Sequence, residues 1–272
     1  MRGGGGGWWG GIRRGALGGL TQSIYNTAAD LGGTYSLLGA ASLCCLRGRL
    51  RWAEFVRQLI FVGWESMPVI LLASAFAGMV LAVQSYYQFS KLTVENLVGL
   101  VVALSMGREI APLLTALVLT SRVGAAMAAE LGTMSVTEQV DAVRSMGVDP
   151  VSYLVAPRFA ASVFMMPILT IFTNVTGILA SAWMSIYVLR VNATFYFKNM
   201  RAYTDPWDIT SGLIKAFFFG MIIVSIACYQ GLAAKKGAEG VGKATTATVV
   251  GSTVLILLAD FVLTLVFKAL VG

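Results

Sequence analysis

Residues 107–158, GREIAPLLTALVLTSRVGAAMAAELGTMSVTEQVDAVRSMGVDPVSYLVAPR, contain the features that decide the fold of this chain. Arg108 and Glu109 interrupt an apolar stretch, and a polar segment with a helical pattern follows and ends at Gly147. A charged side chain in the middle of a membrane-spanning helix costs about 2.5–3.5 kcal/mol on insertion scales, and such groups usually face a partner or a cavity. The stretch therefore predicts a spanning helix with a buried charge pair, followed by a short helix on one face of the membrane.

The composition is that of an integral membrane protein. The chain has 272 residues, of which 57% are hydrophobic and 12% are charged, whereas soluble domains have about 25% charged residues. Its net charge of +7 comes mostly from side chains beside apolar runs, which favours topology signals over a nucleic-acid surface. There is no histidine and no CxxC spacing, so we expect neither a zinc nor a disulfide framework and no bound metal or cofactor.

The first 65 residues predict no membrane span. Residues 1–19 are rich in glycine, and we expect a flexible cytoplasmic tail without a signal peptide. Residues 20–65 have apolar side chains three or four positions apart, most clearly over residues 49–64, where Trp52 and Leu59 share a face. This pattern predicts amphipathic helices that lie in the membrane interface. A soluble helix that packs on a partner is the alternative.

Five apolar segments follow within a membrane domain that we place at residues 66–272. Each is long enough to cross a bilayer, which takes about 20 apolar residues. The third segment exceeds that length and contains Pro157 and Pro167, so we expect it to be tilted or kinked. The expected spans lie at about residues 66–89, 97–119, 153–189, 213–234 and 248–267. The sequence thus predicts an all-α integral membrane fold with five spans.

The distribution of Lys and Arg predicts the orientation of these spans, because cytoplasmic segments are enriched in both. With the N-terminus inside, thirteen of these side chains are cytoplasmic and five are on the opposite side. This bias favours an N-in, C-out topology. The five on the opposite side are Lys91, Arg190, Lys198, Arg201 and Lys268.

The charges within the predicted spans are candidate functional residues. Arg108 and Glu109 are adjacent and point about 100° apart on a helix, so each needs its own partner. Asp260 lies midway along the fifth span, and the long side chain of Lys215 can reach inward from the start of the fourth. We therefore expect a Glu109–Lys215 pair, with Arg108 meeting either Asp260 or an anionic ligand headgroup. A purely structural role for these charges is the alternative.

The loop between the second and third spans predicts a short helix at about residues 135–146. Ser135 and Glu138 have the spacing of a capping box, and Gly147 supplies a C-terminal stop. The polar side chains that lie away from its apolar stripe are Glu138, Asp141 and Arg144. Such a helix is either a docking site for a soluble partner or an ordinary loop helix on the membrane.

The long stretch from Gly107 to Arg158 resembles the signature of the Mla-type (MlaE-like) permeases, which are membrane subunits of lipid ABC transporters that work with MCE proteins. The resemblance extends from about Val69 to the end and includes MVLAVQSYYQF, KATTATVVGS and LADFVLT. The segment DAVRSMG also resembles the ATPase-docking loop of ABC permeases. Arg108 and Glu109 fall on the family's Arg-Glu pair.

The resemblance implies a homodimer with a phospholipid cavity between its subunits. It also implies a cytoplasmic ATPase bound to the loop helices and an MCE-domain protein on the opposite face. It places the Arg-Glu pair near the lipid site, and Lys215 falls on a lysine of the family after the long outer loop. We expect a multi-pass protein of a bacterial inner membrane rather than a plastid envelope.

The chain has no P-loop GxxxxGK[ST], so we expect a non-catalytic subunit whose ATPase partner uses the ATP. Closure of that ATPase on the loop helix would narrow the cavity and move the lipid. In this mechanism Arg108 attracts the phosphate headgroup, and Leu81, Gln88 and Leu92 line the path of the tails. A secondary transporter or ion channel that uses the buried charges as a relay is the first alternative. A membrane enzyme that acts on lipids is the second.

Overall fold

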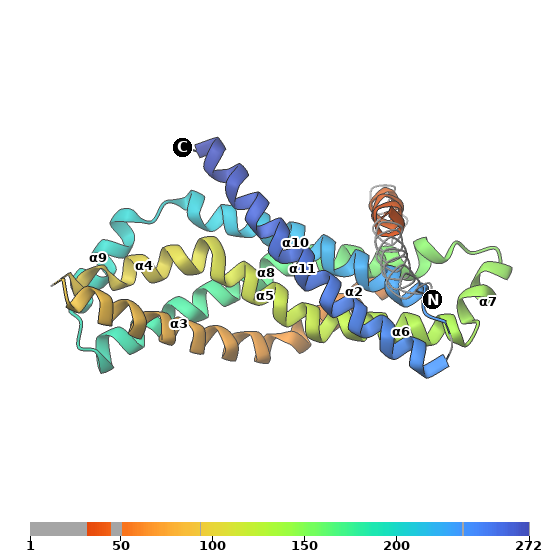
Figure 1. Ribbon diagram of the computed structural model, residues 1–272, viewed down its shortest axis with the longest axis horizontal. Coiled ribbons are helices and arrows are strands. Elements are labelled where there is room, and N and C mark those ends of the chain that lie inside the picture. Colours follow the sequence, from red (N-terminus) through yellow and green to blue (C-terminus); the bar gives the residue numbers. More distant parts are fainter. Residues whose placement is uncertain (1–31, 45–50, 93, 236, 272) are drawn as a thin grey trace, which may run out of the picture.

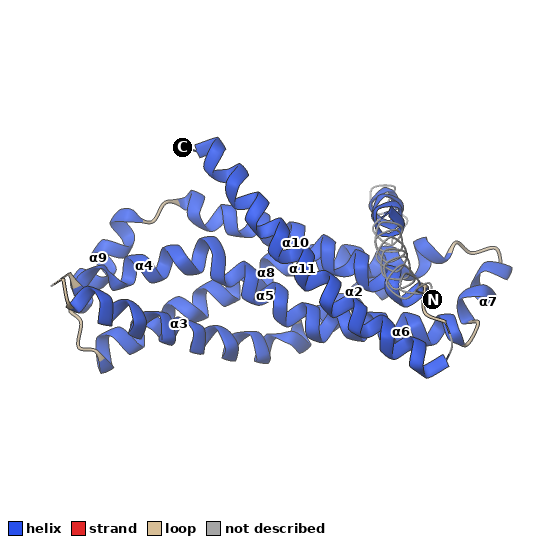
Figure 2. Ribbon diagram, viewed as in Figure 1, coloured by secondary structure: helices blue, strands red, loops and turns tan. Residues whose placement is uncertain are grey.

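The computed structural model describes residues 32–44, 51–92, 94–235 and 237–271, and every element within them is helical (Figures 1 and 2). The predicted tail at residues 1–19 lies outside the described residues. Part of the predicted interfacial region is described, as a helix over residues 32–44 and the helix α2, Trp52–Val62.

Within the described residues, five continuous helical rods have the length and apolar composition needed to cross a membrane, which confirms the number of spans predicted from the sequence. Several are longer than predicted, because helical structure continues past the apolar core into polar flanks. The rods cover Trp52–Ser90, Glu95–Val136, Val151–Val188, Pro206–Leu232 and Gly237–Leu270.

The first rod joins an amphipathic helix to a span. After α2 the chain turns at Gly63 and passes through the short 3-10 helix η1, Trp64–Ser66. The span α3, Met67–Ser90, then starts with Pro68 at a first-turn position, where proline is tolerated because its missing N–H needs no intrahelical partner. Trp52, Val56 and Ile60 of α2 are exposed, as expected of a helix that faces lipid.

The second rod is segmented by two π-helical turns, in which the backbone bonds run from i to i+5. A 3-10 turn, η2 (Glu95–Leu97), opens this rod. The order of the remaining segments is α4 (Val98–Ser105), η3 (Met106–Ile110), α5 (Ala111–Leu119), η4 (Thr120–Gly124) and α6 (Ala125–Val136). The π turn η3 contains Arg108 and Glu109, and η4 contains Arg122. All the charged side chains of this rod between its first turn and α6 therefore lie in irregular turns, which are frequent at functional sites.

The other elements complete the bundle. Two helices connect the rods at opposite ends of the molecule, α7 after the second rod and α9 after the third (Figure 1). The π turns η5 and η6 lie at the two ends of α8. The bounds are α7 (Gln139–Ser145), η5 (Val151–Val155), α8 (Ala156–Trp183), η6 (Met184–Val188), α9 (Ala193–Tyr203), α10 (Pro206–Leu232) and α11 (Gly237–Val271).

The helix α8 lies at the centre of the packing and contacts α3, α10, α2 and α5. Glycine allows the closest approaches between rods, since the helices could not meet with a side chain there. A methyl group at Gly78 of α3 would overlap the backbone of Gly177 in α8, and one at Gly212 of α10 would overlap the carbonyl oxygen of Gly107. The second contact holds α10 against the π turn that contains Arg108 and Glu109.

The outer surface of the rods is apolar. Leu72 and Phe76 of α3 and Leu258 and Phe261 of α11 are more than half exposed, which is expected for helices whose solvent is lipid rather than water. The C-terminal half of α11 projects away from the bundle (Figure 1).

Candidate functional site

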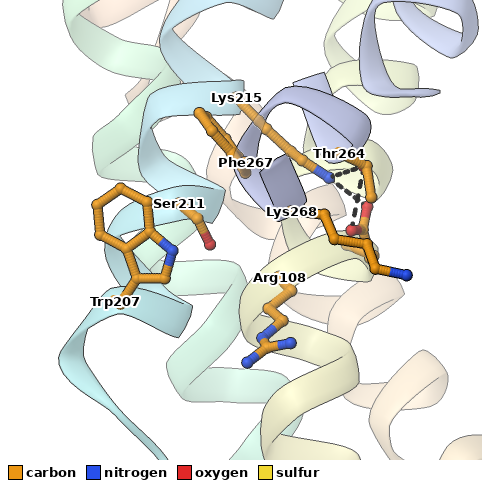
Figure 3. A pocket seen from close by; sticks show the side chains of 8 residues that line it. Arg108, Trp207, Ser211, Lys215, Thr264, Phe267 and Lys268 are labelled. Carbon is orange, nitrogen blue, oxygen red and sulfur yellow. Dashed lines mark hydrogen bonds and ion pairs between the residues drawn. The ribbon is translucent and has the colours of Figure 1, made fainter. Parts of the chain in front are cut away.

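The ammonium group of Lys215 is the centre of a buried ionic cluster. Lys215 lies on α10 and is 1% exposed. Its Nζ forms an ion pair with Glu109 Oε2 of η3 and donates to Thr264 Oγ1 at 2.7 Å (Figure 3). It also lies 3.0 Å from Asp260 Oδ1 of α11. The Glu109–Lys215 pair predicted from the sequence is thus confirmed. Two carboxylates and a hydroxyl satisfy the one cation, and they join three rods at one point.

Arg108 has a different partner from the one predicted. Its Nε donates to Asp208 Oδ1 at 2.7 Å, whereas Asp260 pairs with Lys215. Of the two partners expected for Arg108, Asp260 is therefore wrong, and the anionic headgroup stays a prediction. The reason is that α10 starts at Pro206, seven residues before the predicted span at about residue 213, so Asp208 lies two helical turns before Lys215 and on the same face.

Asp208 has two functions at once. Its Oδ2 accepts from the backbone N–H of Asp205 at 2.9 Å and completes a capping box at the start of α10. Its Oδ1 holds Arg108. The carboxylate is 3% exposed, but the Arg108 side chain is 54% exposed. The guanidinium has five N–H donors in all. It therefore keeps donors free for a ligand while Asp208 holds its Nε.

A cavity of about 330 Å³ lies beside Arg108, Glu109 and Lys215. Arg108, Glu109, Lys215 and Lys268 contribute charge to its wall. Trp207 and Phe267 contribute aromatic surface on another side, and their rings meet edge to face at 6.0 Å (Figure 3). Lys215 is buried between two carboxylates and Arg108 pairs with Asp208, so the exposed cationic groups of the wall are those of Arg108 and Lys268. The cavity thus has a charged wall and an apolar wall.

The predicted tail-path residues do not reach this cavity. Leu81 packs partly buried against the core beside α4. Gln88 lines a separate surface hollow, and Leu92 is 67% exposed at the end of α3. The structure therefore does not bring Leu81, Gln88 and Leu92 together with Arg108. Three residues of the cavity wall were not predicted, namely Trp207, Thr264 and Phe267. Their apolar or hydroxyl side chains have no sequence signal that separates them from packing residues.

The loop helix α7 is shorter than predicted, and its predicted capping box is wrong. Ser135 belongs to α6, where its Oγ donates to the carbonyl oxygen of Leu232 at 3.1 Å. Glu138 precedes α7 in a left-handed conformation, with φ of 60°, and its side chain caps nothing. The predicted stop at Gly147 fits its positive φ of 76°. The Ser135–Glu138 spacing does not mark a helix start, because α6 continues through Ser135 before the chain turns.

The polar face of α7 is open to solvent. Asp141 and Arg144 lie 3.6 Å apart, and both side chains are more than 70% exposed. Val140 is buried and anchors the helix to the bundle. The described structure therefore leaves both charges available to another protein.

The fold and the site together define a class, namely a multi-pass membrane protein with a charged cavity between its helices. The family model "Permease MlaE" matches residues 55–266. The chain belongs to this family of permeases.

Known relatives agree with that membership. A probable ABC transporter permease protein of Rickettsia prowazekii is 46% identical over 86% of this chain and 89% of its own length. The chloroplastic protein TRIGALACTOSYLDIACYLGLYCEROL 1 of Arabidopsis thaliana is 40% identical over 85% of this chain and 66% of its own length. The intermembrane phospholipid transport system permease protein MlaE of Haemophilus influenzae is 37% identical over 79% of this chain and 83% of its own length.

The chain is accordingly a non-catalytic permease subunit of an ABC transporter. This membership decides between the classes that the sequence left open, against both a secondary transporter and a lipid-modifying enzyme. It also implies an ATPase as partner, because ABC permeases do not hydrolyse ATP themselves.

Proposed function

We propose that this permease moves phospholipid between membranes and that the cavity beside Arg108 holds the lipid headgroup. The name of one relative supports phospholipid as the substrate, since it is an intermembrane phospholipid transport permease. A second relative is named for a galactosyl lipid, which supports only lipid as the wider substrate class. The observation that carries the proposal is the half-exposed guanidinium of Arg108, held at its base by Asp208 and open to the cavity.

The chemistry of the cavity fits an anionic headgroup with an apolar body. A planar guanidinium binds phosphate through two parallel N–H donors, which is stronger and more directional than a single ammonium contact. Lys268 adds a second accessible cation, and Trp207 and Phe267 offer surface to glycerol or acyl carbons. The satisfied Lys215 cluster holds the rods together, whereas Arg108 contacts the lipid.

We propose an N-in, C-out topology and a homodimer. The two connecting helices α7 and α9 lie at opposite ends of the bundle (Figure 1), so α7 faces the cytoplasm and the ATPase, and α9 faces an MCE-domain partner. A second copy would close the cavity, whose wall in one chain comes from only three rods, through η3, α10 and α11. The membrane is the bacterial inner membrane in this proposal, as expected from the sequence.

The coupling step starts at α7. ATP-driven closure of the partner presses on the exposed charges of this helix, and α6, the last segment of the second rod, transmits the displacement through η4 to α5. The helix α5 starts directly after η3, which contains Arg108 and Glu109. Movement of α5 therefore changes the position of these two residues in the cavity wall. The cavity narrows and the lipid leaves along the axis.

Purification of the chain with its associated subunits, followed by mass spectrometry of bound lipid, tests this proposal. We expect phospholipid and an ATPase in the wild-type complex, and loss of most bound phospholipid in Arg108→Gln. Lys243→Gln, which removes an exposed cation near the start of α11, is the matched control and should retain the lipid. A complex without phospholipid, or equal lipid in Arg108→Gln and the control, would contradict the proposal.

A further inference from the structure

Two π-helical turns bracket the arm formed by α6 and α7. The turn η4 directly precedes α6, and η5 follows the loop after α7 and leads into α8. In a π turn the backbone hydrogen bonds span five residues instead of the four of a regular α-helix, and such turns are frequent at functional sites. The arm therefore leaves the bundle through one irregular turn and re-enters it through another. A displacement of the arm could be absorbed at either turn unless something braces them.

The first turn is braced by Arg122. Its Nη1 donates to Ser66 Oγ at 2.6 Å, and its Nη2 donates to Glu65 Oε2 at 2.9 Å. The same guanidinium lies 5.9 Å from the centroid of the Phe61 ring. Ser66 is fully buried, while Glu65 is about half exposed. Three contacts thus tie η4 to the C-terminal end of α2 and to η1.

The second turn is braced by Arg51. This residue precedes α2, and its guanidinium carbon lies 4.6 Å from the centroid of the Tyr153 ring in η5. A cation over an aromatic face at this distance is attracted to it. The single helix α2 consequently contacts both π turns, one at each of its ends, through an arginine and an aromatic ring. It also packs along α8 between these ends.

We infer that α2 is a strut between the two hinges of the α6–α7 arm, and that Arg122 and Arg51 are the positioning residues that fix it. The inference rests on the proposed binding of the ATPase to α7. With η4 braced, a push on α7 moves α5 as a rigid segment towards η3, where Arg108 and Glu109 meet α10. Without the brace, the π turn bends and the push does not reach the cavity.

The decisive measurement is the number of phospholipid molecules moved per ATP hydrolysed by the complete complex in liposomes. Arg122→Gln is expected to lower this ratio about fivefold to tenfold, which lies within the effects found for mutations along coupling networks. The exchanged pair, Arg122→Glu with Glu65→Arg, is expected to restore part of the ratio, because it keeps the ion pair between η1 and η4 but loses the contacts with Ser66 and Phe61. Arg57→Gln is the control, since Arg57 is also on α2 but pairs only with Glu54 of the same helix, at 3.8 Å.

Amide hydrogen exchange tests the strut without any transport or ATPase. Loss of one brace should raise exchange at the turn it contacts and, through α2, at the other turn as well. Arg122→Gln is therefore expected to speed exchange at residues 120–124 and also at residues 151–155. Arg51→Gln should produce the reciprocal pattern, and Arg57→Gln neither.

Several outcomes would overturn the strut. One is a transport ratio in Arg122→Gln equal to that of Arg57→Gln, and another is a ratio equally low in Arg122→Gln and in the exchanged pair. A third is faster exchange at residues 120–124 alone. If Arg122→Gln does not fold, Glu65→Gln removes a single contact and is measured in its place with the same expectations. A wild-type complex without phospholipid counts against the proposed function, while the exchange pattern still decides on the strut.

Discussion

Lys215 and Arg144 are both cations with a carboxylate partner, but Lys215 is buried in the bundle and Arg144 is exposed at its end. Lys215 is 1% exposed and contacts Glu109, Asp260 and Thr264 on two other rods. Arg144 is 71% exposed and lies 3.6 Å from Asp141 on its own short helix. A charge away from water needs complete compensation, whereas exposed pairs are screened and contribute about 0–1 kcal/mol. The interior charges are therefore fixed in place, and those of α7 remain free to bind another protein.

The largest expected effect comes from removal of the central cation. Lys215→Met leaves the carboxylates of Glu109 and Asp260 without their partner, and breaking a buried ion pair on one side costs about 3–5 kcal/mol. We expect a loss of about 3 kcal/mol, because Glu109 remains 40% exposed and partly solvated. The midpoint of SDS unfolding in mixed micelles measures it. Lys243→Met, which breaks an exposed pair with Glu239, should change the midpoint little, and equal losses in the two variants would remove the contrast.

A smaller effect is expected where the rods meet closely at this cluster. Gly212→Ala places a methyl group against the carbonyl oxygen of Gly107 and forces α10 away from η3. Overpacking of this kind costs about 1–3 kcal/mol, and here it also separates Asp208 and Lys215 from their partners. The same unfolding assay measures it. Gly251→Ala of α11 is the control, because its new methyl group meets Ile226 at an ordinary contact distance of 3.8 Å. A comparable loss of stability in this variant would show that the close approach of α10 to η3 is not the cause.

A buried polar group outside the spans gives the next effect. Tyr196 of α9 is fully buried and shares a hydrogen bond with Ser181 at 3.0 Å. Tyr196→Phe should cost about 1 kcal/mol at neutral pH, measured by the same unfolding midpoint.

The stability that Tyr196 contributes should depend on pH. Burial raises the pKa of Tyr196 above its ordinary value of 10.0, against a smaller lowering by the neighbouring hydroxyl groups of Ser181 and Ser185. A raised pKa in the folded state stabilises the protein below pH 10.0, and that stability is lost as the pH rises from there through the folded pKa. The difference between wild type and Tyr196→Phe should therefore shrink above pH 10.0. A difference that stays constant or grows would contradict burial as the cause.

The smallest effect on stability is expected at α7. Arg144→Glu should change the free energy of unfolding by less than about 0.5 kcal/mol, because the pair is exposed. Its effect on binding should be larger, since reversal of a charge at an interface opposes a complementary partner. We expect the variant to lose most of the co-purified ATPase. Lys243→Glu, an equally exposed cation near the start of α11, is the control, and the same loss in both variants would argue against a specific role of α7.

Part of this contrast could be predicted from the sequence. The five spans follow from apolar length, and the Glu109–Lys215 pair follows from the cost of charge in a membrane. Asp208 was missed because it lies in the polar segment TDPWDIT, which reads as a loop. The signal that could have found it is Asp205-Pro206 with an acid three residues after Asp205, a helix start that carries α10 past the lipid-facing stretch.

The π turns and the contacts of Arg122 had no comparable signal. A π turn has no residue signature, since its backbone pattern depends on how the neighbouring rods pack. Arg122 and Glu65 are 57 residues apart, and no local pattern relates two such positions.

What the sequence determined by itself is the class of fold and the presence of charges that must be compensated inside it. Both depend on hydrophobicity along the chain, which is a local property. Only the tertiary structure decided which charges meet, because Arg108 and Asp208 are separated by 100 residues and their contact depends on the register of two rods. That register is set by close packing at Gly107 and Gly212, and packing is a property of surfaces that form only when the helices assemble.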